Sequence, residues 1–327
     1  MPRALITGIS GQDGSYLAES LLEDGFEVHG IVRRTSLEIQ ETKLARIANV
    51  LDQLTLHPCS LESQTGLFEI VRTIKPDYLY HLGAQSFVSY GFEGEYATLD
   101  TNLGSTHALL SAVLKFAPHC RFYFASSSET FGNAESSPQN ESTPFNPRTI
   151  YGISKLAGFH LSKAFRENKE IHSCAGILYN HESPRRGKEY VTQKIISQAV
   201  AIHRGQAKEI RLGNLNARRD WGHAQDYVSA MRKITESEMP DDFVVASGHT
   251  HSVRDFCEKA FSLLDLNFDE FFKADPRFFR SSEKTPLCGD ASKIKRLLGW
   301  SPTHALDSIV EEMLDCEMAR ASNELSR

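Results

Sequence analysis

A glycine-rich turn stands between the first apolar run of the chain and its first helical pattern. Residues 4–7 are typical of a strand and residues 16–22 of a helix, and Gly8, Gly11 and Gly14 lie between them at intervals of three. Glycine allows a tight turn and lets backbone N–H groups approach a pyrophosphate, whose charge is favoured at a helix N-terminus. Glycine turns also occur for purely structural reasons, but this position between strand and helix predicts a dinucleotide site.

Short apolar runs alternate with helical patterns through the first half of the chain, which predicts βαβ units and a parallel sheet. We therefore expect an α/β fold, with a Rossmann-type doubly wound parallel sheet over residues 1–180. Residues 181–327 are expected to form mainly a smaller, mixed α/β substrate domain, from which later segments return to the first. The expected strands cover 4–7, 27–32, 78–82, 121–126, 210–212 and 243–246, and the expected helices 16–22, 106–116, 192–204 and 226–235.

Composition excludes several classes of protein. The 327 residues carry a net charge of −6, which opposes non-specific binding to nucleic acid or to an anionic membrane. Six scattered cysteines contain no CxxC pair, so we expect no metal site and reduced thiols. The chain passes from Met1 straight into a strand and holds no apolar span of membrane length, so we expect a cytoplasmic protein.

Two arginines mark the end of the second expected strand. NAD enzymes usually place an acidic residue there, on the ribose 2′-hydroxyl, whereas this chain has Arg33 and Arg34. Guanidinium groups attract a 2′-phosphate, so the pattern favours NADP over NAD. The alternative is that the two arginines are a solvated surface pair.

A catalytic group is expected where the 121–126 strand ends. Ser127 and Glu129 follow that strand, and Tyr151 and Lys155 are spaced to share one face of a later helix. A nearby ammonium favours phenolate, and the phenolate takes the proton of an alcohol while hydride leaves the same carbon. The residues therefore predict oxidation of an alcohol by a nicotinamide cofactor.

Together these stretches give a resemblance that covers essentially the whole chain. The sequence resembles the GDP-mannose 4,6-dehydratases, within the extended short-chain dehydrogenase/reductase family, at residues 7–17, 82–86, 126–132, 179–187 and 219–224. The resemblance implies that Tyr151 is the base at the C4 hydroxyl, with Lys155 lowering its pKa, and that Ser127 hydrogen-bonds O4. Glu129 would remove the C5 proton, acidified by oxidation at C4, and assist loss of the C6 hydroxyl as water.

The resemblance also implies two sets of binding residues. Those for the NADP cofactor are Gly8, Gly11, Gln12, Asp13, Arg33, Arg34, Ser36, Leu82, Ala84, Ser86, Tyr96, Lys155, His181 and Arg186. Those for the GDP-sugar are Ser86, Asn180, Val191, Lys194, Arg219, Arg280 and Glu283. Relatives assemble as dimers or tetramers, so we expect a homodimer or homotetramer in which residues 33–44 bridge subunits.

Three positions depart from the family pattern. Ser127 replaces threonine, Ser60 replaces the aspartate thought to meet the adenine, and the segment 279–283 lacks a proline after Arg280. These departures keep open a bulkier GDP-sugar such as GDP-manno-heptose. A nucleotide-sugar 4-reductase or epimerase would share Tyr151 and Lys155 but has no use for Glu129, and a non-catalytic NADP sensor would require neither of the pair.

Overall fold

The computed structural model describes residues 1–86, 92–278 and 285–324. Within them, one sheet of seven parallel strands has the order β10-β6-β5-β4-β1-β2-β3. Its strands, in chain order, are β1 (Arg3–Thr7), β2 (Glu27–Val32), β3 (Leu54–Pro58), β4 (Tyr78–His81), β5 (Arg121–Ser127), β6 (Ser173–Leu178) and β10 (Asp242–Val245). β1 pairs with β4 on one side and with β2 on the other. This topology confirms the predicted Rossmann-type fold.

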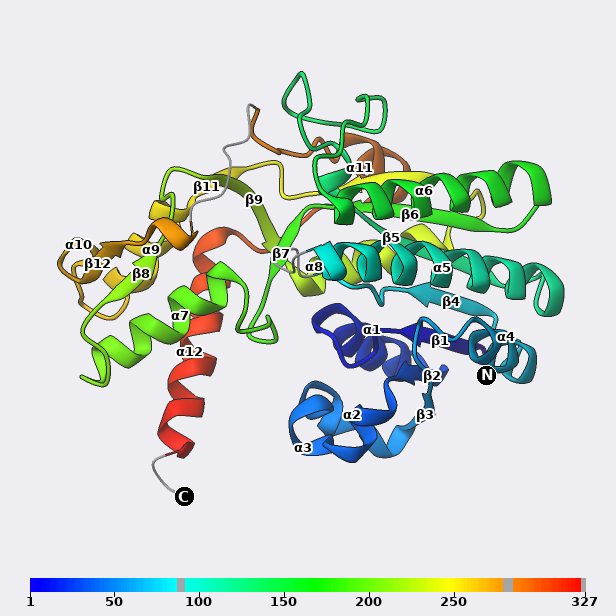
Figure 1. Cartoon of the computed structure of the whole chain (residues 1–327), viewed down its shortest axis with the longest axis horizontal. Coiled ribbons are helices and arrows are strands. Elements are labelled where there is room, and N and C mark those ends of the chain that lie inside the picture. The colour runs from blue at the N-terminus through cyan, green and yellow to red at the C-terminus, as the bar shows by residue number, and fades with distance from the viewer. Residues whose placement is uncertain (87–91, 279–284, 325–327) are drawn as a thin grey trace.

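Helices cover both faces of this sheet (Figure 1). On one face α5 (Phe92–Phe116) packs between α4 (Gln64–Ile74) and α6 (Ile150–Lys169). On the other face α1 (Gln12–Glu23) packs against α8 (Ala224–Glu236), and α11 (Ser292–Leu298) contacts β10. Short helices α2 (Arg34–Glu38), α3 (Gln40–Lys43) and η1 (Ala45–Gln53) join β2 to β3. Except for β3 at one end of the order, whose residues are only partly buried or exposed, the strands are largely buried, as a sheet covered on both faces requires.

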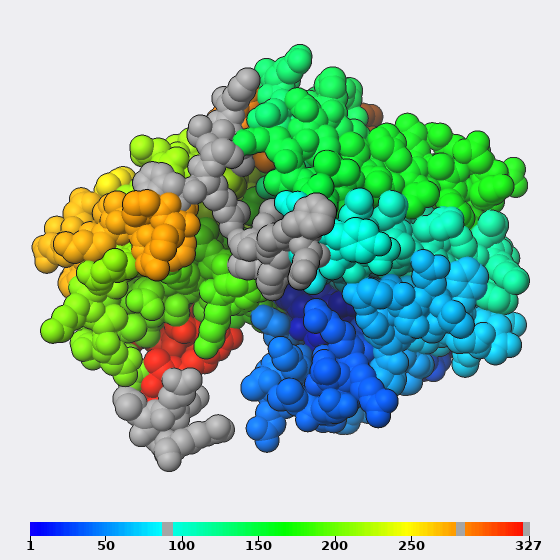
Figure 2. Space-filling model, in the orientation of Figure 1, coloured from blue at the N-terminus to red at the C-terminus, as the bar shows by residue number. Residues whose placement is uncertain are grey.

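A second hydrophobic core lies beside the sheet, on the left in Figure 1. Its helices are α7 (Val191–His203), α9 (Val253–Ser262), α10 (Phe268–Phe271) and α12 (Leu306–Glu324), and η3 (Pro276–Phe278) follows α10. Two small sheets accompany them, one of β7 (Asn180–Glu182), β9 (Arg218–His223) and β11 (Thr250–Ser252), the other of β8 (Ile210–Leu212) and β12 (Phe272–Ala274). Figure 2 shows the surface hollowed between the blue N-terminal segments and the green and red segments of this part.

The chain crosses between the two cores more than once. α8, β10 and α11 all follow residue 180 but contribute to the core of the large sheet, through Tyr227, Phe243 and Ile294. The expected domain boundary at residue 180 therefore does not separate the two cores. That residues 181–327 mainly bind the sugar nucleotide stays a prediction. In the described part of the chain, no helix combines the length and apolar character that crossing a bilayer requires.

Candidate active site

The glycine turn is packed against the loop that follows β4. Gly8 has a φ of +75°, and a Cβ atom there would lie 2.9 Å from the Cα of Gly83. A side chain at Gly14 would overlap the carbonyl oxygen of Gly8, and the Gly11 N–H donates to that oxygen at 2.9 Å. Gly11 precedes α1 without a side-chain cap, so the helix N-terminus presents backbone N–H groups. This cradle fits a dinucleotide pyrophosphate.

The carboxyl end of β2 presents two cationic side chains. Arg33 and Arg34 are exposed at that point, and the Nε atom of Arg34 lies 3.5 Å from Glu38. Ser36 is buried, and its backbone N–H donates to the carbonyl oxygen of Arg33 at 2.8 Å. Both arginine side chains are therefore exposed at the carboxyl end of β2.

The end of β3 differs from the family pattern, as the sequence predicts. Ser60 is exposed there and donates a hydrogen bond to the carboxylate of Glu62. The other oxygen of Glu62 accepts from the Thr101 hydroxyl at 2.9 Å. A carboxylate is thus present near this strand end, although not at position 60.

Ser127, Glu129 and Tyr151 come together where β5 meets the start of α6. The Ser127 hydroxyl accepts from the Glu129 N–H at 3.2 Å, and the same side chain is near enough to Tyr151 to lower the pKa of the phenol. Thr149 caps α6 by accepting from the N–H of Gly152 at 3.0 Å. A Cβ atom at Gly152 would lie 2.6 Å from the carbonyl oxygen of Glu129. Only glycine therefore lets α6 approach the Glu129 turn this closely.

Lys155 lies one helical turn after Tyr151, as predicted. Its Nζ atom donates to the carbonyl oxygen of Ala125 at 2.8 Å and lies 5.8 Å from the ring centroid of Tyr151. Burial lowers the pKa of Lys155 to about 8, although the charge of Asp13 opposes that shift.

The pKa of Tyr151 is raised rather than lowered. Burial is the main cause, and Tyr190 and Glu129 add to it, while the hydrogen bond from Ser127 opposes it. Because the ammonium of Lys155 is directed at a backbone carbonyl oxygen, it does not offset the burial of the phenol. Our expectation of a phenol acidified by Lys155 is therefore wrong for the ligand-free chain.

Tyr190 is a site residue that the sequence does not predict. Its hydroxyl lies 3.1 Å from the Ser86 hydroxyl, and the guanidinium carbon of Arg186 lies 3.6 Å from its ring centroid. The Nε atom of Arg186 in turn lies 3.1 Å from Glu182. Tyr190 thus joins the loop after β4, which also holds Leu82 and Ala84, to the start of α7. Local sequence holds no signal for this contact, because the partners are 104 residues apart.

Gln12, Asp13 and His181 meet where the first turn of α1 touches β7. The Gln12 amide donates to the carbonyl oxygen of His181 at 3.1 Å, and Asp13 forms an ion pair with the His181 ring. Tyr96 is also an expected cofactor residue, but it lies on α5 and 72% of its surface is exposed, whereas Gln12 and His181 are buried.

The expected sugar-nucleotide residues are spread over β7, α7 and β9. Asn180 pairs with Trp221 of β9, and Val191 begins α7 with 38% of its surface exposed. The Nζ atom of Lys194 donates to the carbonyl oxygen of Arg211 at 2.8 Å and lies 3.7 Å from the ring centroid of Phe278. Arg219 lies on β9, and its guanidinium donates to the carbonyl oxygen of Arg218 at 2.7 Å. Arg280 and Glu283 lie outside the described residues.

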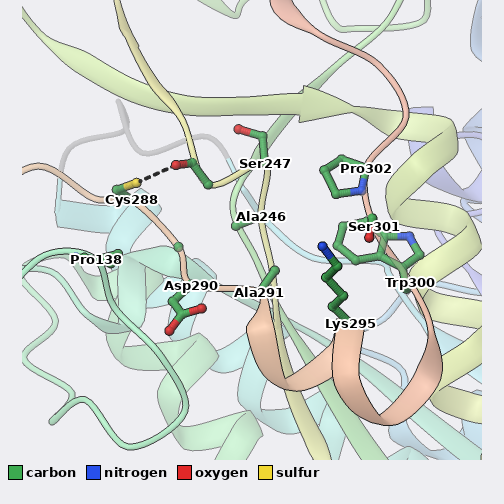
Figure 3. Close-up of a pocket in the computed structure, with 12 residues that line it drawn as sticks. Pro138, Ala246, Ser247, Cys288, Asp290, Ala291, Lys295, Trp300, Ser301 and Pro302 are labelled. Atoms are coloured by element: carbon green, nitrogen blue, oxygen red, sulfur yellow. Dashed lines mark hydrogen bonds between the residues drawn. The ribbon is translucent and has the colours of Figure 1, made fainter.

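A cavity of about 450 Å³ lies away from these groups, beyond the carboxyl end of β10 (Figure 3). Ser247, Cys288, Lys295 and Trp300 are among its lining residues, and none of the predicted catalytic residues lines it. The site is therefore defined by the converging side chains at the sheet edge and not by this cavity.

Comparison with known proteins identifies the family. The model of the GDP-mannose 4,6-dehydratase family matches residues 5–313. The GDP-mannose 4,6 dehydratase of Homo sapiens is 42% identical, over 98% of this chain and 92% of the human protein. The GDP-mannose 4,6-dehydratase of Vibrio cholerae is 38% identical, over 95% of this chain and 92% of its own length.

Solved structures share the fold at lower sequence identity. A putative epimerase from Burkholderia cenocepacia has a TM-score of 0.84 at 25% identity, over 97% of this chain and 98% of its own. The dTDP-glucose 4,6-dehydratase of Bacillus anthracis, solved in complex with NAD, has a TM-score of 0.84 at 18% identity, over 98% of both chains. On the family match and the curated relatives, this chain belongs to the GDP-mannose 4,6-dehydratase family.

Proposed function

We propose that the chain converts GDP-mannose to GDP-4-dehydro-6-deoxy-mannose with loss of water, using NADP. The observation that carries this proposal is the placement of Glu129 beside Tyr151, through the Ser127 hydroxyl and the close approach of Gly152. Oxidation or reduction at C4 requires only one proton-transferring side chain besides the cofactor, the phenol of Tyr151. Removal of the C5 proton requires a second group, and a carboxylate is suited to it.

The residues at the sheet edge fit a nicotinamide dinucleotide. The cradle formed by Gly8, Gly11 and Gly14 would hold its pyrophosphate, because a Cβ at Gly8 or Gly14 would collide with neighbouring backbone. Arg33 and Arg34, exposed at the end of β2, would hold a 2′-phosphate, which supports NADP over NAD. A nicotinamide held by these residues would supply the hydride chemistry, acceptance of hydride from C4 of the sugar and its return at C6.

The side chains divide the proton transfers between them. Tyr151 removes the proton of the C4 hydroxyl, and Ser127 orients that hydroxyl by a hydrogen bond. Because burial raises the pKa of Tyr151 in the ligand-free chain, the phenol must lose its proton when the site is filled, and the positive charge of an oxidised nicotinamide would favour that loss. Glu129 removes the C5 proton once C4 is a ketone, and the same carboxyl group delivers that proton to the departing C6 hydroxyl, so that water leaves. When hydride returns to C6, C5 takes up one proton, which balances the proton removed from the C4 hydroxyl.

The test is mass spectrometry of the purified chain mixed with GDP-mannose and catalytic NADP+, with no other oxidant or reductant. We expect the sugar nucleotide to lose the mass of one water. A reductase or an epimerase gives no such loss, and neither does a cofactor sensor. Glu129→Gln is expected to keep NADP+ bound and to abolish water loss, so normal turnover by that variant would refute the role of Glu129.

The same assay separates related substrates. If GDP-mannose is unchanged while a bulkier GDP-sugar such as GDP-manno-heptose loses water, the reaction type stands and the substrate is the larger sugar. The smaller side chain of Ser127, compared with threonine, is the reason to test that alternative, although the curated relatives are named for GDP-mannose. We also propose a homodimer or homotetramer, which light scattering tests, and a monomer at all concentrations would refute it.

A further inference from the structure

A buried pair of charged side chains joins the first turn of α1 to β7. The Nε2 atom of His181 lies 3.0 and 2.9 Å from the two carboxylate oxygens of Asp13. The Nδ1 atom of the same ring lies 2.7 Å from the backbone carbonyl oxygen of Tyr179. Each ring nitrogen therefore faces an acceptor within the protein, and because only 9% of His181 is exposed, water has little access to the ring.

These partners determine the protonation state of the ring. Carbonyl and carboxylate oxygens only accept hydrogen bonds, whereas a neutral imidazole has one N–H and one lone pair. A neutral His181 would therefore direct a lone pair at an acceptor in a buried place, which is repulsive. With Asp13 ionised, both nitrogens donate and the ring is an imidazolium.

The charges around the pair agree with this assignment. Burial disfavours the imidazolium, but the charge and hydrogen bond of Asp13 outweigh it and raise the pKa of His181 above its ordinary value. Burial also disfavours the Asp13 carboxylate, but His181 and Arg186 outweigh it and lower the pKa of Asp13. Lys155 of α6 is a further cation near Asp13, and the phenol of Tyr227 on α8 is kept neutral by burial.

Packing and hydrogen bonds hold the ring in one orientation. The ring of Tyr227 stacks on His181 with a centroid distance of 4.4 Å and an interplanar angle of 30°. The Gln12 amide, beside Asp13, donates to the carbonyl oxygen of His181 at 3.1 Å and accepts from the Ser183 hydroxyl at 2.8 Å. The first turn of α1 is therefore tied to β7 and to the residue after it by three contacts: one from Asp13 and two from the Gln12 amide.

We propose that Asp13 holds His181 as an imidazolium at neutral pH, and that His181 is a positioning residue that fixes the first turn of α1 against β7. With both ring N–H groups occupied, His181 has no hydrogen bond left to donate to a dinucleotide. Its influence on the cofactor passes through the backbone of the α1 N-terminus, where the pyrophosphate would bind. The cofactor part of this inference rests on the proposed function, whereas the protonation state does not.

The protonation state is tested directly by NMR of the ¹⁵N-labelled histidine rings in the intact chain. His181→Gln assigns the signal, by its disappearance. We expect both nitrogens of His181 to be protonated at pH 7.5 in the wild type. In Asp13→Asn we expect only one to be protonated at this pH, because burial and Arg186 then lower the pKa of the ring below its ordinary value. Glu23→Gln, which removes an exposed charge from the other end of α1, should leave the signal unchanged. A singly protonated His181 in the wild type at pH 7.5 would overturn the proposal.

The positioning role is tested by NADPH binding, measured from the cofactor's fluorescence without turnover. Loss of a charge-assisted hydrogen bond predicts about tenfold weaker binding for Asp13→Asn and for His181→Gln, with the double variant no weaker than the weaker single variant. Glu23→Gln should bind as the wild type does. If His181 instead donates to the dinucleotide, the two losses multiply in the double variant, and the positioning role is wrong. If even the wild type fails to bind NADPH, the proposed cofactor is wrong, and the NMR result still decides the protonation state.

Discussion

Replacing Gly152 by alanine tests how closely α6 must approach the turn that carries Glu129. The added Cβ would lie 2.6 Å from the carbonyl oxygen of Glu129 and 3.2 Å from the Cβ of Pro147. Cβ atoms essentially never come within 3.0 Å of a non-bonded heavy atom of another residue, so α6 or the turn must move by several tenths of an ångström. The obstacle is backbone, which cannot swing aside as a flexible side chain would.

The displacement acts on stability and on catalysis together. Overpacking of this kind costs about 1–3 kcal/mol of unfolding free energy. Because Tyr151 directly precedes Gly152, the same movement changes the separation of the phenol from Glu129. Misplacement of catalytic groups by about 1 Å lowers rates by about a hundredfold, so a shift of several tenths predicts a loss in kcat of about tenfold or more.

Gly104→Ala on α5 is the matched control. Its added Cβ would have the amide nitrogen of Gln64 as its nearest neighbour, at an ordinary 3.7 Å. Alanine is the better helix former, so this variant should be more stable by about 0.5–1 kcal/mol with kcat unchanged. The assay is urea unfolding of each variant, together with mass-spectrometric turnover of GDP-mannose at saturating NADP+. A Gly152→Ala protein with wild-type stability and kcat would refute the reasoning.

Three further predictions follow from single contacts. Arg33→Ser combined with Arg34→Ser should weaken NADP binding and leave NAD binding unchanged, and titration calorimetry showing equal losses for both would contradict the 2′-phosphate role. Lys155→Met should abolish turnover but not destabilise the fold. The pKa of Lys155 is about 8 in the folded chain and 10.5 in the unfolded chain, so between these pH values the unfolded state binds more protons. As pH rises through this range, the free energy of unfolding of the wild type should therefore increase relative to that of the variant, which urea unfolding measures. Asp242→Asn should cost about 3–5 kcal/mol, because it breaks a largely buried ion pair with Arg166 at 2.6 Å, and a midpoint unchanged in thermal unfolding would contradict this.

Local patterns predict several of the elements that place the candidate site at the carboxyl ends of the parallel strands. The expected strands at 27–32 and 210–212 match β2 and β8 in full. The glycine turn correctly predicts that α1 follows β1. These features depend on neighbours within a few residues, which is the range that hydrophobic periodicity and turn chemistry describe. The patterns do not predict β3, a strand of alternating partial burial at the sheet edge, or β6, which lies buried inside the sheet.

Long-range contacts are the part of the site that local patterns miss. The bond between Asp13 and His181 spans 168 residues, and the contact of Tyr190 with Ser86 spans 104. Neither leaves a trace in periodicity, because each pairs residues from different elements. The pKa of Tyr151 is missed for a related reason. Its sequence neighbour Lys155 predicts an acidified phenol, whereas burial by the whole fold and the distant Tyr190 decide the shift.

The central claim is that one site both oxidises C4 and eliminates water across C5 and C6 without external reductant. GDP-mannose labelled with deuterium at C4 tests it in a single turnover, with the product analysed by NMR. The account predicts that the deuterium moves to C6 of the product, because the hydride leaves and returns within one site. Deuterium that appears on free cofactor, or that remains at C4 of the sugar, would contradict the account.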